Sequence, residues 1–121
     1  MAAGERLICA SADLAERGKG LRFSVERYGQ TQPAFAIRFN GVVRAYVNRC
    51  THIWVELDWV EGEFFDMSGL YLVCATHGAA YLPESGRCVA GPCSGKGLTP
   101  LRVKEADGNV FLIDQDPVPN E

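Results

Sequence analysis

Two cysteine–histidine pairs are the residues of this sequence best suited to chemistry. Cys50 and His52 lie in CTH, residues 50–52, and Cys74 and His77 lie in CATH, residues 74–77. These are the only two histidines in the chain, and each stands close to a cysteine. Two thiolates and two imidazoles can bind a tetrahedral zinc ion. They can also hold a [2Fe–2S] cluster in which two histidines replace two cysteines on one iron.

The spacing of the two pairs favours the cluster over zinc. Zinc fingers usually take two cysteines from one turn and two histidines from a helix. Here each pair offers one cysteine and one histidine, and 21 residues (53–73) separate His52 from Cys74. This arrangement lets both cysteines bind one iron and both histidines the other. A structural zinc module remains a minor alternative.

Short β-strands are the elements expected to position these pairs. We expect strands at 6–10, 21–28 and 69–74, a hairpin in 33–48 that turns at Asn40-Gly41, and a hairpin in 98–114 that turns at Asp107-Gly108-Asn109. Residues 21–28 alternate between apolar and polar, the period of a half-buried strand, and Asn-Gly is a preferred hairpin turn. One helical turn is expected at 11–18, capped by Ser11 and ended by Gly18. Seven or eight short strands predict an all-β fold, a small antiparallel sandwich or barrel.

Composition and charge exclude several functions. A chain of 121 residues predicts one domain. The net charge of -3, without a basic run, argues against nucleic-acid binding. No apolar run is long enough to span a bilayer, and no signal peptide is evident, so we expect a cytoplasmic protein without membrane contact. We expect the polar tail, residues 115–121, to be frayed.

The five cysteines cannot all be paired, because their number is odd. In a reducing cytosol, cysteines near histidines favour metal or redox chemistry over a disulfide framework. We expect Cys9 in the core. We expect Cys88 and Cys93 to be buried free thiols, with a redox-active disulfide between them as the alternative.

The two motifs together resemble those of the Rieske iron–sulfur proteins. The resemblance rests on CTH at 50–52, CATHG at 74–78, and the segment GAAYLPESGRCVAGP at 78–92. That segment is similar to the family's cluster-binding segment, with an aromatic residue, a Ser/Thr-Gly turn and a Gly-Pro loop. Here these are Tyr81, Ser85-Gly86 and Gly91-Pro92. The resemblance covers nearly the whole chain and implies a single Rieske domain, 1–121, with a cluster-binding subdomain over roughly 48–95.

The resemblance implies one [2Fe–2S] cluster per chain. Cys50 and Cys74 would bind the inner iron, and His52 and His77 would bind the outer iron near the surface. The residues that it places around the cluster are Gly78, Ala79, Tyr81, Gly91 and Pro92.

Departures from the high-potential respiratory members imply a lower reduction potential. Those proteins carry an extra cysteine in each ligand loop, where this chain has Val55 and Thr76. They also carry a serine that bonds to the cluster, where this chain has Ala79. Because a lost hydrogen bond to a cluster sulfur lowers the potential, we expect roughly -150 to +100 mV, the lower or middle part of the Rieske range.

As a function, the resemblance implies a soluble one-electron carrier rather than an enzyme. It would take electrons from a flavin-dependent reductase and pass them to a terminal oxygenase or a similar enzyme, as a monomer or weak oligomer. Beyond His52 and His77 there is no histidine for a mononuclear two-His-one-carboxylate iron site. This absence and the chain length argue against an oxygenase catalytic subunit. A small electron-transfer subunit of a larger oxidoreductase, such as a nitrite reductase, and a redox or iron sensor remain alternatives.

The acidic residues between the two pairs have two interpretations. They could steer a basic partner toward the cluster, but a solvated loop surface is the interpretation we favour. The set consists of Glu56, Asp58, Glu61, Glu63 and Asp66.

Overall fold

The computed structural model describes residues 6–27, 29–49, 57–58, 60–74, 78–91 and 97–113 of the chain. These residues contain ten β-strands and one short 3-10 helix, η1 (Ser11–Asp13). The strands are β1 (Arg6–Ala10), β2 (Leu21–Arg27), β3 (Gln30–Phe39), β4 (Val42–Val47), β5 (Leu72–Val73), β6 (Ala80–Tyr81), β7 (Cys88–Ala90), β8 (Pro100–Leu101), β9 (Val103–Ala106) and β10 (Asn109–Leu112). The predicted all-β fold is confirmed. No helix within these ranges is long and apolar enough to cross a membrane.

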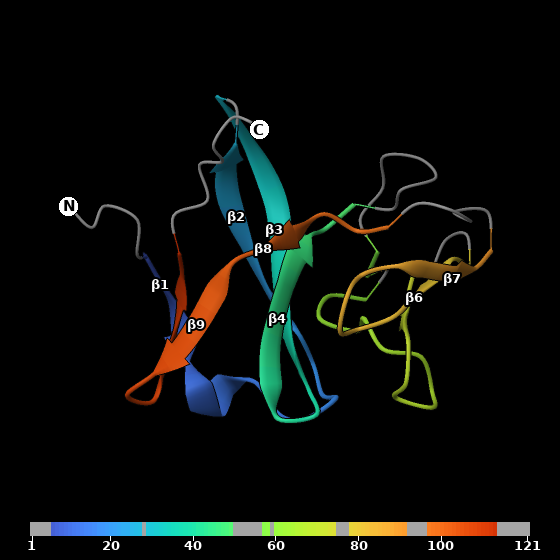
Figure 1. Ribbon diagram of the computed structural model, residues 1–121, viewed down its shortest axis with the longest axis horizontal. Helices are drawn as coiled ribbons and strands as arrows, with labels where there is room; N and C mark the ends of the chain where they lie inside the picture. Colours follow the sequence, from blue (N-terminus) through green and yellow to red (C-terminus); the bar gives the residue numbers. More distant parts are fainter. Residues whose placement is uncertain are drawn as a thin grey trace.

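The strands form three antiparallel sheets. The first sheet has the order β1-β10-β9, the central sheet β2-β3-β4-β8, and the third sheet β5-β6-β7. The third sheet lies to one side of the other two (Figure 1). It contains the strand that leads into the second cysteine–histidine pair.

The two hairpins expected from the sequence are confirmed. Both of their turns contain two residues with positive φ angles. Asn40 and Gly41 have φ angles of 54° and 79°, between β3 and β4. Asp107 and Gly108 have φ angles of 53° and 77°, between β9 and β10. Asn-Gly and Asp-Gly are the dipeptides that tolerate this conformation best. Ten strands exceed the seven or eight expected, since β6, β7 and β8 are too short to show a period.

The central sheet is buried on both faces, and β3 shows how its sequence allows this. The small side chains of Ala34 and Ala36 pack on one face, in a cluster that includes residues of β1 and β10. The large side chains of Phe35, Ile37 and Phe39 pack on the other face, in a cluster with residues of β5, β6 and β7. Alternation between small and large residues therefore sets the first sheet on one side and the third sheet on the other.

The expected helical turn at 11–18 is wrong in its length and in its cap. The structure has only η1, and the Ser11 side chain does not cap it. Leu14 is extended, with φ -119° and ψ 100°, and is buried. Glu16 then pairs with Arg38 of β3 in a short bridge. Burial of Leu14 and pairing with the sheet therefore outweigh continuation of a short helix.

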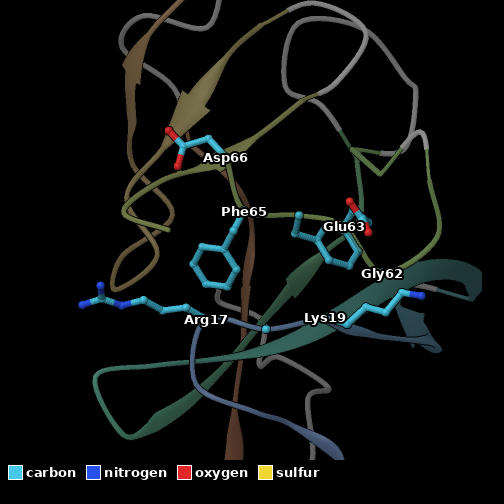
Figure 2. Close-up of a pocket in the computed structure, with 8 residues that line it drawn as sticks. Arg17, Lys19, Gly62, Glu63, Phe65 and Asp66 are labelled. Atoms are coloured by element: carbon cyan, nitrogen blue, oxygen red, sulfur yellow. The ribbon is translucent and has the colours of Figure 1, made fainter. Parts of the chain in front are cut away.

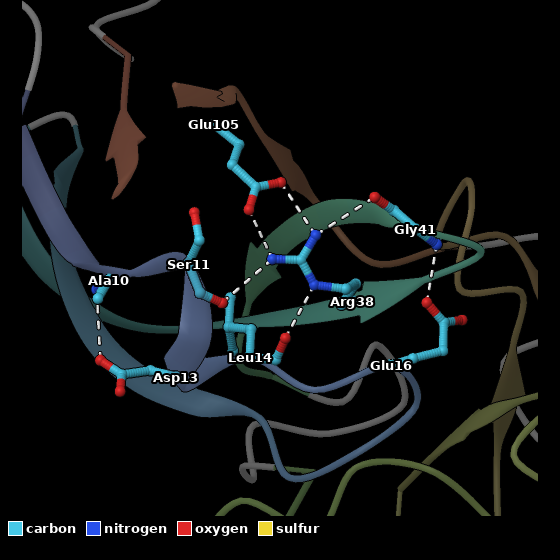
Figure 3. A network of polar contacts seen from close by, with 8 residues as sticks. All are labelled: Ala10, Ser11, Asp13, Leu14, Glu16, Arg38, Gly41 and Glu105. Carbon is cyan, nitrogen blue, oxygen red and sulfur yellow. Dashed lines mark hydrogen bonds and ion pairs between the residues drawn. The ribbon is translucent and has the colours of Figure 1, made fainter. Parts of the chain in front are cut away.

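An Arg38 network joins the central sheet to the first sheet (Figure 3). The Arg38 guanidinium donates two hydrogen bonds to the Glu105 carboxylate, at 2.9 and 2.6 Å. It also donates to the backbone carbonyls of Leu14 and Ser11, at 2.8 and 3.2 Å. The hydrogen bond from Arg38 is the main cause that lowers the pKa of Glu105, to about 2. Glu105 is therefore a carboxylate in the folded protein at neutral pH.

Tyr46 joins the central sheet to the third sheet. Its hydroxyl donates a buried hydrogen bond of 2.7 Å to the carbonyl of Pro83, in the turn between β6 and β7. Burial raises the pKa of Tyr46 to about 12, so the hydroxyl keeps its proton. A Cβ on Gly86, in the same turn, would approach the Tyr46 ring to 2.8 Å. This close contact sets the position of the third sheet.

Candidate metal centre

Cys74 is the predicted ligand that the structure describes directly. It follows β5, is wholly buried, and is not part of a disulfide. Its backbone N–H donates to the Ala79 carbonyl at 2.9 Å, and its carbonyl accepts from the Gly78 N–H at 2.8 Å. Gly78 has a φ angle of +76°, which permits this tight turn. Backbone hydrogen bonds therefore join the two ends of the second ligand loop, the segment from Cys74 to Gly78. His77 lies outside the described residues.

Gly91 packs directly on the second ligand loop. A Cβ built on Gly91 would lie 2.8 Å from the Ala79 Cα and 3.1 Å from the Gly78 carbonyl oxygen. These neighbours are backbone atoms and cannot rotate away. Gly91 also has a φ angle of +90°, which side chains other than glycine rarely adopt. Gly91 therefore packs against the backbone of Gly78 and Ala79, while Pro92 lies outside the described residues.

Ala79 and Tyr81 are both wholly buried, in one cluster with Cys74. Tyr81 lies in β6, where it pairs with Leu72 of β5 and Cys88 of β7. This places the ring in the centre of the third sheet. That Tyr81 lies beside the cluster stays a prediction.

The first ligand loop is described through its two flanks, because Cys50 and His52 lie outside the described residues. Asn48 follows β4 and is buried, with an exposed fraction of 1%. Its side-chain oxygen accepts from the Leu57 N–H at 2.9 Å, and its side-chain nitrogen donates to the Asp58 carboxylate at 3.0 Å. One side chain thus holds the beginning of the loop against its end.

Asp58 does not belong to a solvated acidic surface, so that interpretation is wrong for this residue. Its exposed fraction is 6%. Its second carboxylate oxygen accepts from the Gly62 N–H at 2.9 Å and lies 3.4 Å from the Arg22 Nε. A buried carboxylate requires such partners, since burial without them costs several kcal/mol. The expectation holds for Glu61 and Glu63, which are exposed; Asp66 is partly buried, and Glu56 lies outside the described residues.

The sequence motifs did not indicate Asn48 and Asp58 as residues that flank the first ligand loop. A signal for Asn48 was present, because side chains alternate along a strand. Tyr46 of β4 packs toward the third sheet, and Asn48, two residues later, takes the same side. No comparable signal existed for Asp58, whose partners are ten and more residues away.

Cys88 is buried, as expected, but it is disulfide-bonded rather than a free thiol. Its partner lies outside the described residues. The expectation rested on a reducing compartment, which carries no information on how close two cysteines lie. Cys9 is a free thiol and lies in the core of the first and central sheets, as expected.

Among the described residues, no group of three metal-binding side chains lies together. A cavity of about 300 Å³ lies beside β2, between residues 17–19 and 62–66. Figure 2 shows Arg17 and Lys19 on one side of it and Glu63 and Asp66 on the other. Among the described residues, its lining contains no cysteine or histidine.

The described part of the centre fits a [2Fe–2S] cluster. It offers a buried cysteine that is not in a disulfide, and two closely packed glycine-containing loops beside it. Thiolate sulfur with imidazole nitrogen is the donor set of a cluster with two histidines on one iron. The sequence contains side chains of these types at Cys50, His52, Cys74 and His77, of which the structure describes Cys74.

Comparison with known proteins assigns the family. The family model of the Rieske [2Fe-2S] domain matches residues 5–111, and this chain belongs to that family. The Rieske domain holds one [2Fe–2S] cluster, so the predicted cofactor is confirmed at the level of the family. Among curated protein sequences, none matches this chain.

Several solved structures share the fold. The ferredoxin of carbazole 1,9a-dioxygenase from Nocardioides aromaticivorans IC177 is 20% identical, with a TM-score of 0.73 over 93% of this chain and 99% of that chain. A chain in the complex of reduced oxygenase and oxidized ferredoxin in carbazole 1,9a-dioxygenase is 24% identical, with a TM-score of 0.72 over 94% and 96%. The terminal oxygenase of carbazole 1,9a-dioxygenase from Novosphingobium sp. KA1 is 29% identical, with a TM-score of 0.71 over 98% of this chain but 31% of that chain. Family and fold together define a Rieske-type electron-transfer protein.

Proposed function

We propose that this chain is a one-electron carrier that passes electrons from a flavin-dependent reductase to a terminal oxygenase or a similar enzyme. Membership of the Rieske family supports the carrier. Similarity over nearly full length to a dioxygenase ferredoxin, and to a chain from an oxygenase–ferredoxin complex, supports the oxygenase as acceptor. The reductase and the monomeric or weakly oligomeric state rest on the resemblance of the sequence alone, and the cytoplasmic location stays a prediction.

The ligands of the cluster would be Cys50 and Cys74 on one iron and His52 and His77 on the other. When bound, the cluster supplies reversible one-electron transfer. The chain's own residues give Cys74 a dry environment, since Leu72, Ala79 and Tyr81 around it are wholly buried. Residues 48–95, which include the third sheet, would form the cluster-binding subdomain.

The observation that carries the proposal is the state of Cys74. A cysteine that is wholly buried, outside any disulfide and held by two backbone hydrogen bonds is a ligand position prepared by the fold. Because thiolates are costly to bury without a counter-charge, iron would compensate the charge of the thiolate. Cys9 is also buried, with 9% exposure against 0% for Cys74, but it belongs to the other core cluster.

The test is metal content and spectroscopy on protein purified without oxygen. We expect two irons and two acid-labile sulfides per chain, and a Rieske-type EPR signal after reduction with dithionite. Cys74→Ser should lose the signal, whereas the matched control Cys9→Ser should keep it. Zinc in place of iron, or no metal, would refute the carrier.

A permanent component of a larger oxidoreductase is the second candidate. The observation that favours it is the identity of 29% to a terminal oxygenase, over 98% of this chain and 31% of that chain. Size-exclusion chromatography of the protein from its native cells separates the two candidates. A carrier elutes at a mass near 13.2 kDa, and a permanent component elutes with its larger partner.

A further inference from the structure

In the part of the chain that the structure describes, side-chain hydrogen bonds join the two flanks of the first ligand loop. Asn48 uses both ends of its amide, one for the Leu57 N–H and one for Asp58. Its own backbone N–H donates to the Pro33 carbonyl at 2.8 Å, which anchors Asn48 to β3. The residue two positions before Cys50 is thus held to the central sheet and to the far end of the loop at once.

Asp58 extends this anchor to two further segments. One carboxylate oxygen holds Asn48, and the other accepts from Gly62 and faces Arg22 of β2. The side chain of Asp58 has no exposed surface in this ion pair, while that of Arg22 is 33% exposed. Burial of a carboxylate carries a desolvation cost that an apolar pair of the same size would avoid. A buried polar pair is therefore expected where fixed geometry matters more than stability.

The anchor also relates the first loop to the second. Leu57, whose N–H is held by Asn48, is wholly buried in the same cluster as Cys74 and Ala79. Any shift of Leu57 therefore displaces the packing around the second loop. Since a cluster bound by both loops requires its ligands at fixed separation, the relative position of the loops matters for its electronic properties.

We propose that Asn48 and Asp58 are positioning residues for the cluster. They hold the first ligand loop at a fixed position relative to the second. The inference rests on the proposed function, because it takes Cys50 and His52 as ligands. Neither residue touches the cluster in this proposal. Both act on it through the loop whose ends they join.

The test uses Asn48→Ala, which removes both side-chain hydrogen bonds, and Asp58→Asn, which keeps the shape and removes the charge. Glu105→Gln is the matched control, because it weakens a polar pair of the first and central sheets far from the ligand loops in sequence. Each holo-protein is compared by its reduced EPR spectrum, its reduction potential, its rate of iron loss to a chelator and its urea midpoint.

We expect both loop variants to lose iron about ten- to hundredfold faster than the wild type, with altered EPR g values. Asp58→Asn should in addition raise the reduction potential, because the added electron no longer meets a buried negative charge. Glu105→Gln should lower the urea midpoint and leave the EPR spectrum and potential unchanged. If Asn48→Ala does not fold, Asp58→Asn decides the question alone.

Two results would overturn the inference, and they are distinguishable. Wild-type protein without iron would refute the proposed function and the inference together, before any variant is compared. Iron-loaded wild type with loop variants whose g values, potential and iron loss match those of Glu105→Gln would refute the positioning role alone.

Discussion

Gly91→Ala should strain the second ligand loop, and the structure gives the size of the effect. Two costs add at this position. The first is a non-glycine residue at a φ angle of +90°, about 1–2 kcal/mol. The second is the contact of the new Cβ with the Ala79 Cα at 2.8 Å and the Gly78 oxygen at 3.1 Å. Overpacking of this kind costs about 1–3 kcal/mol. The expected destabilisation is therefore about 2–5 kcal/mol.

Gly108→Ala separates the two costs. Gly108 has a φ angle of +77°, and a Cβ built on it meets no atom within 4 Å. This variant should show the backbone cost alone, about 1–2 kcal/mol. The effect of the substitution on the unfolded chain is the same in both variants and cancels in their difference. The difference in urea midpoint between them thus measures the contact with the second ligand loop.

The properties of the cluster should change only where the new Cβ contacts the second ligand loop, and not where the substitution strains the backbone alone. Gly91→Ala pushes against the backbone of Gly78 and Ala79, so the EPR g values should change and iron should be lost faster. Gly41→Ala is a second control, because Gly41 lies in the β3–β4 turn, has a φ angle of +79°, and its Cβ would meet nothing within 4 Å. Equal midpoints for Gly91→Ala and Gly108→Ala, with wild-type EPR spectra in both, would refute the reasoning.

Three further predictions concern the Arg38 network, the hydrogen bond from Tyr46 to Pro83, and the reduction potential of the cluster. Glu105→Gln should lower the free energy of unfolding by about 1–2 kcal/mol at pH 7. The lowering of the Glu105 pKa from 4.5 to about 2 sets an upper limit of about 3 kcal/mol for this loss. The side chain is 30% exposed, so screening by solvent makes the actual loss smaller than that limit. Because that pKa is depressed in the folded state, the stabilisation is complete above pH 4.5 and is lost as the pH falls toward 2; a wild-type-minus-variant difference in urea midpoint that is equal at pH 7 and pH 3 would contradict this. Tyr46→Phe should lower the free energy of unfolding, measured by urea denaturation, by about 1–2 kcal/mol, since it leaves the buried Pro83 carbonyl without its donor. An unchanged urea midpoint would show that this hydrogen bond does not stabilise the contact between the central and third sheets. Ala79→Ser should raise the reduction potential in a redox titration, because a hydroxyl at this position can bond to a cluster sulfur; an equal or lower potential would contradict the comparison with the respiratory members.

The parts of the fold that the sequence predicts are those with local causes. The hairpins at Asn40-Gly41 and Asp107-Gly108 follow from residue types that tolerate positive φ angles. The strand at 6–10 coincides with β1. In each case the residues that set the structure are neighbours in the chain, so their pattern is visible without coordinates.

The parts that escaped prediction depend on distant contacts. Strand β8 has only two residues, and its pairing with Ala45 and Tyr46 of β4 defines it. Continuation of η1 is prevented by the pairing of Glu16 with Arg38, 22 residues along the chain. Neither pairing leaves a period or a turn signal in the sequence.

In the candidate site, too, the features with local causes were predicted and those that depend on distant contacts were not. The motifs indicate the ligand types, since two cysteines and two histidines in this spacing suit few centres. Nothing in the sequence indicated that Asp58 is buried, because aspartate side chains are mostly exposed to solvent. Its burial follows from the positions of Asn48, Gly62 and Arg22, which come from three separate segments.

The two ligand loops are held by different kinds of bonds, and this determines which substitutions each can accept. Backbone hydrogen bonds of Cys74 and the close packing of Gly91 hold the second loop. Those bonds are indifferent to side-chain chemistry, so a small polar residue at Ala79 can change the cluster's surroundings without opening the loop. The first loop depends on the side chains of Asn48 and Asp58, where even an isosteric change removes a bond or a charge. Variation of the reduction potential at constant stability should therefore be reached through Ala79, whereas changes at Asn48 or Asp58 should alter the potential and iron retention together.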